Sequence, residues 1–199
     1  MTTFYRTLIL VILLIAAASC KYRGKEIGRF HLTEEMKSQV PYKSHETINF
    51  IDSNDNTLTF TGGSRIEQDL EVKDCISCYD YVVYEEDLIN FNNGSDYIRL
   101  TIRASEQSYL NVRYTIDGHV FLSGFSSPLS VENIGENEYF LDSITVNNIV
   151  FYDIYKDSIR SEKSITLNQY PIYSYYSTEY GVLKIEFSDS TSWEYVKTN

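Results

Sequence analysis

The chain has 199 residues, which suits one domain better than two. Hydrophobic residues make up 43% and charged residues 23% of it, so a packed core is feasible and intrinsic disorder is disfavoured. The formal net charge of −11 repels phosphate backbones, which argues against nucleic acid as a partner.

The first twenty residues form a candidate export leader. Arg6 and the free amino terminus supply a small positive charge, and residues 8–18 are an unbroken apolar run. At 1.5 Å per residue this run covers roughly half of a ~30 Å hydrocarbon core, so it is too short for a comfortable membrane span. It is instead typical of the hydrophobic region of a secretory signal peptide.

The end of this run resembles the lipobox of bacterial prolipoproteins, in the residues Ala17-Ala18-Ser19-Cys20. Ala17 stands where that family most often has Leu. The resemblance implies that signal peptidase II removes residues 1–19, that Cys20 carries a diacylglycerol thioether, and that the new amino terminus is acylated. Because Lys21 and not Asp follows the cysteine, the resemblance favours the outer membrane as the place of the anchor.

A lipidated tether is expected over residues 20–29, because residues 21–25 are short, basic and contain a glycine. Loss of residues 1–19 would remove one of the 17 basic residues and leave 16 against 28 acidic ones. No shift in composition marks a second domain, so residues 30–199 are expected to form a single one.

One short helix is predicted at the start of this domain. Thr33 is a good N-cap for residues 33–38, Glu34 and Glu35 lie in the first turn, and Pro41 ends the helix. After it, segments rich in aromatic and β-branched residues alternate with turn residues almost to the end of the chain. Strands are predicted at 47–51, 58–61, 66–72, 79–91, 97–102, 112–116, 119–122, 144–155, 164–170, 182–187 and 193–196.

The clearest hairpin is centred on Asp117-Gly118, which supplies the two positive φ angles of a type I′ turn. A two-residue loop pairs Ile116 with His119 and Tyr114 with Phe121. About ten strands joined by short turns predict an all-β domain. It is an antiparallel meander that forms either one barrel or two stacked sheets.

Cys75 and Cys78 form the only Cys-x-x-Cys segment. In an oxidising envelope compartment these two cysteines can close a small disulfide loop. Their flanks look extended, whereas a redox cysteine needs a helix N-terminus. A zinc site needs about four ligands, and the three histidines are scattered. A disulfide or inert thiols are therefore favoured, and neither a metal nor another cofactor is predicted.

Asp52, Asn54 and Asn56 match the opening of a calcium-binding loop. The match then fails, because Thr57 and Gly63 stand where the loop requires Gly and a bidentate Glu. An Asx-rich hairpin turn has the same composition for local hydrogen-bonding reasons, and this second interpretation is favoured.

Tyrosines crowd the segment around Pro171, and Tyr173, Tyr175 and Tyr176 are the candidate binding residues. Exposed aromatic side chains can stack on sugar rings or anchor a protein interface. In a strand-rich domain they also fill the core or form cross-strand pairs. Both interpretations remain open.

The favoured function is a lipid-anchored, noncatalytic β-domain of the bacterial envelope that binds a ligand or a partner. A barrel would hold a ligand in its mouth, and a sandwich would bind a protein or glycan partner on loops or an edge strand. The alternative is an envelope hydrolase whose acid–base pair comes from scattered Asp and Glu residues. A deep pocket with two converging carboxylates would favour the enzyme. A filled interior with an aromatic surface patch would favour the binding module.

Overall fold

The computed structural model describes residues 24–73, 80–130, 132, 134–135, 137–161 and 167–197. The described chain is nearly all antiparallel β structure with one short helix, as the sequence predicts. It divides into two compact units, each described by itself: the described residues of 30–70 and 84–197 form the larger unit, and those of 24–29, 71–73 and 80–83 belong to the smaller.

Helix α2 (Glu34–Ser38) begins where the sequence predicts. The Thr33 hydroxyl accepts a hydrogen bond from Met36 N at 3.2 Å. The strands before the middle of the chain are β1 (Glu26–Phe30), β2 (Thr47–Asp52), β3 (Thr57–Gly62), β4 (Ile66–Val72), β5 (Tyr81–Asn93), β6 (Asp96–Arg103), β7 (Tyr109–Ile116) and β8 (His119–Ser126). Those after it are β9 (Glu138–Val146), β10 (Ile149–Ser158), β11 (Arg160–Ser161), β12 (Pro171–Ser177), β13 (Gly181–Phe187) and β14 (Ser192–Tyr195).

In the smaller unit β1 pairs with β5. Lys25 is bonded at both backbone groups: its N donates to Asp80 Oδ1 at 3.0 Å, and its carbonyl accepts from Tyr81 N at 3.1 Å. Residues 26–29, which the sequence assigns to the tether, therefore lie in a strand.

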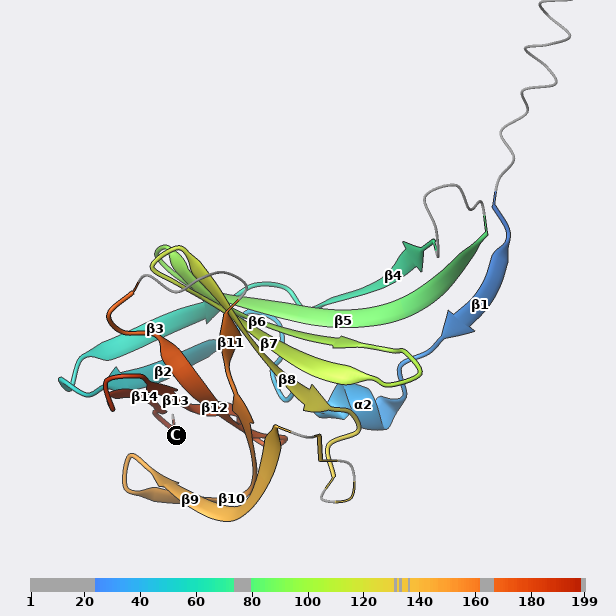
Figure 1. The fold of residues 1–199 in the computed structure, drawn as a ribbon. Helices are drawn as coiled ribbons and strands as arrows, with labels where there is room; N and C mark the ends of the chain where they lie inside the picture. Colours follow the sequence, from blue (N-terminus) through green and yellow to red (C-terminus); the bar gives the residue numbers. More distant parts are fainter. Residues whose placement is uncertain are drawn as a thin grey trace, which may run out of the picture. The chain divides into compact units, whose positions relative to one another are not determined.

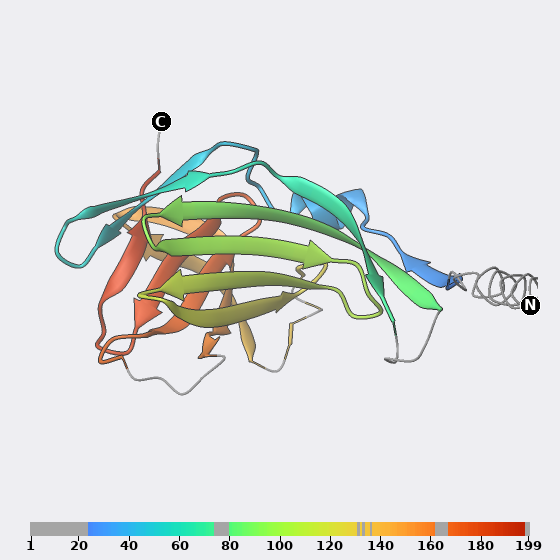
Figure 2. The ribbon, with the colours of Figure 1, turned by 90° about the horizontal axis from the view of Figure 1, so that it is seen from above.

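The larger unit is built on one curled antiparallel sheet, in the order β11-β8-β7-β6-β5-β3-β2-β14-β13-β12-β10-β9. Figures 1 and 2 show the result: β5–β8 (green) run side by side in one layer, and β12 and β13 (orange-red to red) cross it in another. The path turns back on itself near its end, because β10, the last strand but one, continues past Ile159 into β11, which pairs with β8. The sheet thus curls back on itself, as a barrel-like fold requires.

Two hydrophobic clusters form on opposite sides of the β12–β13 layer. The main core fills the inside of the curl, with aromatic side chains such as Phe91, Phe121 and Tyr114 at 0% exposure. The second cluster is small and lies beneath the β9–β10 hairpin. Its buried members are Val146, Phe151, Ile154, Tyr175 and Leu183.

The hairpin at Asp117-Gly118 is confirmed. Both residues have positive φ angles, of 50° and 75°, and the strands pair Ile116 with His119 and Tyr114 with Phe121. The aromatic and aliphatic side chains of β7 thereby alternate into the main core.

Two strand predictions in the C-terminal half were wrong. The predicted strand 144–155 is a hairpin, because Asn147 and Asn148 take φ angles of 50° and 63° and form a two-residue turn. Of the predicted strand 164–170, residues 164–166 lie outside the described residues and 167–170 are not a strand. Pro171 is instead the first residue of β12, a position that tolerates proline.

Candidate binding surface

The three tyrosines named from the sequence do not form one surface patch. Tyr176 is 0% exposed, and its hydroxyl donates to the Gln39 carbonyl at 2.6 Å, so burial raises its pKa well above the ordinary value. Of the two interpretations of these tyrosines, the environment of Tyr176 matches the one in which the side chain fills the core. Tyr175 lies in the second cluster and donates to Glu186 Oε2 at 2.8 Å.

Lysine ammonium groups lie over the rings of Tyr173 and Tyr175. Lys156 Nζ lies 3.8 Å from the ring centroid of Tyr173 and 5.0 Å from that of Tyr175, and Lys184 Nζ lies 5.9 Å from the latter. These are cation–π distances. A sugar that stacked here would have to displace Lys156, so the arrangement favours a structural role over a glycan platform.

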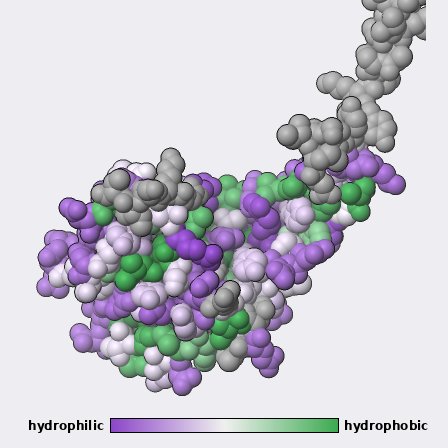
Figure 3. Space-filling view, viewed as in Figure 1, coloured by the Kyte–Doolittle hydropathy of each residue, from purple (hydrophilic) through white to green (hydrophobic). Residues whose placement is uncertain are grey.

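The neighbouring β9–β10 hairpin carries an exposed hairpin patch. Four of the eight large hydrophobic side chains that are exposed in the described residues belong to this hairpin. They are Tyr139, Ile149, Val150 and Tyr152, with exposed fractions of 55%, 37%, 49% and 68%. Figure 3 shows hydrophobic surface at the lower end of the view, where Figure 1 places β9 and β10.

Asp153 explains how one hairpin both covers a cluster and exposes side chains. Its φ angle is 56°, in the left-handed region, so the ordinary alternation of β10 is interrupted. Phe151 and Ile154 are both buried, with the exposed Tyr152 and Asp153 between them. The hairpin therefore packs one surface against the second cluster and presents the other to solvent.

The tip of the hairpin is tied to the sheet that it covers. Asn147 N donates to Glu194 Oε2 at 3.0 Å, and Lys184 pairs with the other oxygen of Glu194 at 3.5 Å. Asn147 and Glu194 also line a groove of about 210 Å³ with Asp52 and Asp55. The Asp52 carboxylate forms hydrogen bonds within its own turn. It accepts hydrogen bonds from Asn54 N and Asn56 N at 2.8 Å each, as in an Asx turn.

Strand β9 is the last strand of the sheet path, and among the described strands it pairs only with β10. An edge strand offers backbone donors and acceptors to another chain. Asp142 and Ser143 lie exposed at its middle. Asp142 makes no ion pair among the described residues, and neither does the nearby Asp153.

Two carboxylates do converge, but inside the wall of the fold. Glu138 on β9 lies directly opposite Asp157 on β10, and their exposed fractions are 8% and 0%. Both accept hydrogen bonds from β8. Glu138 and Asp157, called the carboxylate pair below, line neither the groove at Asn147 nor the one described next.

A second groove, of about 250 Å³, lies between α2 and strands β4 and β5 and is lined mainly by acidic residues. Three of these acids have a basic partner. Glu67 pairs with Lys37 at 2.8 Å, Glu85 with His31 at 2.7 Å, and Glu86 with Arg103 at 2.6 Å. The bond to His31 is the main reason that the pKa of Glu85 is lowered. Lys37 and Arg103 offset part of the charge of the groove, and the Lys37–Glu67 pair joins α2 to the sheet.

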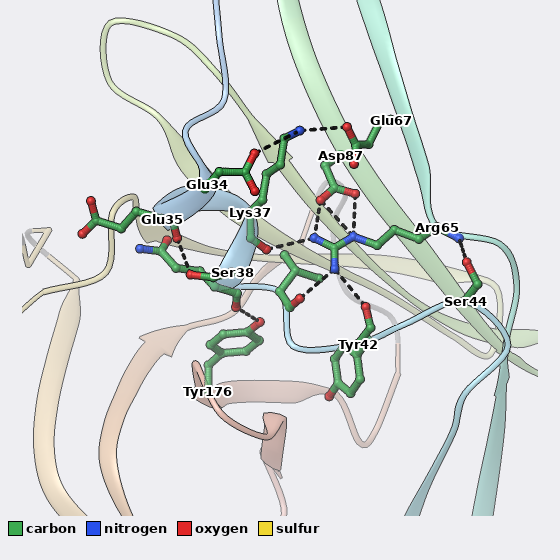
Figure 4. Close-up of polar contacts among 12 residues, drawn as sticks. Glu34, Glu35, Lys37, Ser38, Tyr42, Ser44, Arg65, Glu67, Asp87 and Tyr176 are labelled. Atoms are coloured by element: carbon green, nitrogen blue, oxygen red, sulfur yellow. Dashed lines mark hydrogen bonds and ion pairs between the residues drawn. The ribbon is translucent and has the colours of Figure 1, made fainter.

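Arg65 is the centre of this junction and was not singled out in the sequence (Figure 4). Its guanidinium pairs with the fully buried Asp87 and donates to the carbonyl oxygens of Lys37, Val40 and Tyr42 at 2.9 to 3.0 Å. No local pattern marks the pair, since Arg65 lies in the loop before β4 and Asp87 on β5, and the two meet only when the sheet forms.

Cys20, Cys75 and Cys78 lie outside the described residues. Within the described ranges, no group of three or more His, Cys, Asp or Glu residues is placed to hold a metal ion. Nor is any described helix long and apolar enough to span a membrane.

The chain was compared with protein-family models, with curated proteins and with solved structures, and none of the three comparisons found a match.

Proposed function

We propose that the protein is a lipid-anchored, noncatalytic module of the bacterial envelope that binds a partner protein through the β9–β10 hairpin. The observation that carries this proposal is the exposed hairpin patch, in which Val150 and Tyr152 project from the outward face of β10. Tyr139 and Ile149 add exposed hydrophobic surface at the two ends of the hairpin, on the face that covers the second cluster. Adjacent exposed hydrophobic residues, such as Val150 and Tyr152, mark interaction sites more often than scattered ones do. The lipobox-like segment ending at Cys20 supports the anchor, and Lys21 after it favours the outer membrane as its place.

The surroundings of the patch favour a cationic, extended segment of the partner. Asp142 and Asp153 are exposed on the same hairpin and have no basic partner among the described residues. Strand β9 has a free edge along which an extended segment can add as a further strand. A second copy of this acidic chain would instead place Asp142 against like charge.

The enzyme alternative has less support. An acid–base pair must reach its substrate, and the carboxylate pair is buried and lines neither groove. The main core is filled with aromatic and aliphatic side chains. This filling favours recognition at the surface over a ligand held inside the curl.

The test is site-specific photo-crosslinking in cells, with the reactive group at Tyr152 and a control at Tyr109, which is 42% exposed on β7. We expect a discrete cross-linked product from Tyr152 and none of the same mass from Tyr109. The affinity of the purified partner should then fall at least tenfold with Tyr152→Ala, as for an aromatic anchor, and remain unchanged with Tyr109→Ala. Equal products from both positions, or equal affinities of both variants, would refute the hairpin as the binding surface.

A further inference from the structure

The carboxylate pair replaces a missing piece of β ladder at the place where the sheet curls back on itself. β11 pairs with β8 only at Leu122 and Phe121. Further along β8, Gly124 N donates to Asp157 Oδ2 at 2.8 Å, and Ser126 N donates to Glu138 Oε1 at 2.9 Å. Two side chains thus accept the backbone donors that a neighbouring strand would otherwise satisfy.

The serine hydroxyls of β8 complete these contacts. Ser123 Oγ donates to the same oxygen of Asp157 at 3.0 Å, and Ser126 Oγ donates to the same oxygen of Glu138 at 3.0 Å. Each carboxylate therefore takes two hydrogen bonds on one oxygen. The second oxygens, Asp157 Oδ1 and Glu138 Oε2, are buried without a hydrogen-bond partner.

An unpartnered carboxylate oxygen in the interior is costly, and two facing carboxylates that are both charged are more costly still. Residues directly opposite on an antiparallel pair have Cβ atoms about 5 Å apart, which brings two acidic side chains within reach of each other. A single proton between the free oxygens would satisfy both and remove one charge.

We propose that Asp157 and Glu138 share one proton in the folded protein, and that this proton holds β8 to the base of the β9–β10 hairpin. Loss of the proton leaves two negative charges in the wall of the fold and weakens this junction. Acidification therefore strengthens the attachment of the hairpin. The inference does not require the binding role proposed above.

Burial, hydrogen bonds and nearby charges of the described residues act on the pKa of Asp157 in opposite directions. Burial is the main cause that raises the pKa of Asp157, and the charge of Glu138 raises it further. The bonds from Gly124 and Ser123 and the charge of Arg160 on β11 act in the opposite direction. Tyr114 on β7 also lies near Asp157, whose charge contributes to raising the pKa of that phenol.

The sign of the pH effect follows from linkage. A carboxyl whose pKa is higher in the folded than in the unfolded chain contributes stability that is fully present below its unfolded pKa of about 3.9, and that is lost as pH rises through its folded pKa. Each unit by which the folded pKa exceeds the unfolded pKa changes the ratio of folded to unfolded chain about tenfold.

Asp157→Asn is the decisive variant, because the amide keeps an oxygen for β8 and offers a permanent N–H to Glu138. Urea midpoints of the full-length chain in detergent are measured at pH 5, 6.5 and 8 for the wild type and this variant. We expect the urea midpoint of the wild type to rise relative to that of the variant as the pH falls from 8 to 5. Asp142→Asn, an exposed change on the same hairpin, is the control and should follow the wild type.

A second measurement reads the proton directly. In ¹³C NMR spectra of Asp-labelled full-length chain, the carboxyl signal that Asp157→Asn removes should titrate above the ordinary aspartate range. Parallel pH profiles of the wild type and Asp157→Asn, or titration of that signal at or below about 3.9, would overturn the proposal. So would stabilisation of the wild type but not of Asp157→Asn by calcium at pH 8, because a cation would then fill the place given to the proton.

Discussion

Asp153 shows how one residue directs an element. A left-handed backbone conformation disfavours side chains other than glycine, although Asp and Asn tolerate it better than most. At Asp153, with a φ of 56°, it brings Phe151 and Ile154 to the same side of the hairpin. Without this conformation, the alternation of a regular strand would place them on opposite faces.

The positive φ of Asp153 predicts that valine is tolerated worse there than at Asp142. Asp153→Val should lower the free energy of unfolding by about 1–2 kcal/mol, because a β-branched residue is strained at positive φ, and Asp153→Gly should be close to neutral. Asp142, exposed on β9 and without a positive φ, is the control, and Asp142→Val should be tolerated. Urea unfolding measures all three variants. Equal effects of valine at both positions would contradict the strain argument.

At the scale of the element, α2 and the segment after it are attached to the sheet by polar contacts as well as by packing. A five-residue helix has no stability of its own, so its place depends on tertiary partners. Arg65 provides them by bonding three carbonyl groups of residues 37–42 and the carboxylate of Asp87. Tyr42 adds a contact from the same segment, since its hydroxyl accepts from Val182 N at 2.8 Å.

Removal of the Arg65 guanidinium should therefore detach this segment and leave a buried charge. We expect Arg65→Met to lower the free energy of unfolding by about 3–5 kcal/mol, as for other broken buried pairs. Arg99 is the matched control, because it is exposed and its Nε donates to Asn90 Oδ1. Arg99→Met should change stability by less than about 0.5 kcal/mol. Chemical denaturation measures both, and a small loss with Arg65→Met would show that packing alone holds α2.

At the scale of the whole molecule, the lipobox-like leader determines where the domain is expected to act. Lipid chains contribute about 0.8 kcal/mol for each buried CH₂, so two or more of them hold a protein at the membrane nearly irreversibly. The mature chain would retain 16 basic and 28 acidic residues. Such a domain is repelled by an anionic surface and attracts cationic partners.

The anchor is tested at Cys20. We expect the wild-type chain to incorporate labelled fatty acid and Cys20→Ser to lose the label and to remain uncut by signal peptidase II, since the thioether needs the thiol. Cys75→Ser is the matched control and should keep the label. Intact-mass measurement decides the outcome, because a mature chain that begins at Cys20 without acyl mass would leave an ordinary secreted protein.

Local patterns were sufficient for several features whose physical cause lies within a few residues. The N-cap at Thr33, the turn at Asp117-Gly118 and the alternation that marks the all-β class are all of this kind. The turn at Asn147-Asn148 was equally local. The strand predicted over residues 144–155 missed it, because the apolar residues on both sides of the two asparagines resemble one continuous strand.

The tertiary structure alone decided the environment of the side chains. Asp157 and Ser123 are 34 positions apart, Arg65 and Asp87 are 22 apart, and Tyr176 and Gln39 are 137 apart. In the sequence, no local pattern distinguishes Asp157 from the other acidic residues or Tyr176 from the other tyrosines. Only the curling of the sheet buries one carboxylate opposite another, directs Tyr176 into the core and leaves Tyr152 in solvent, because burial and charge partners depend on which strands become neighbours.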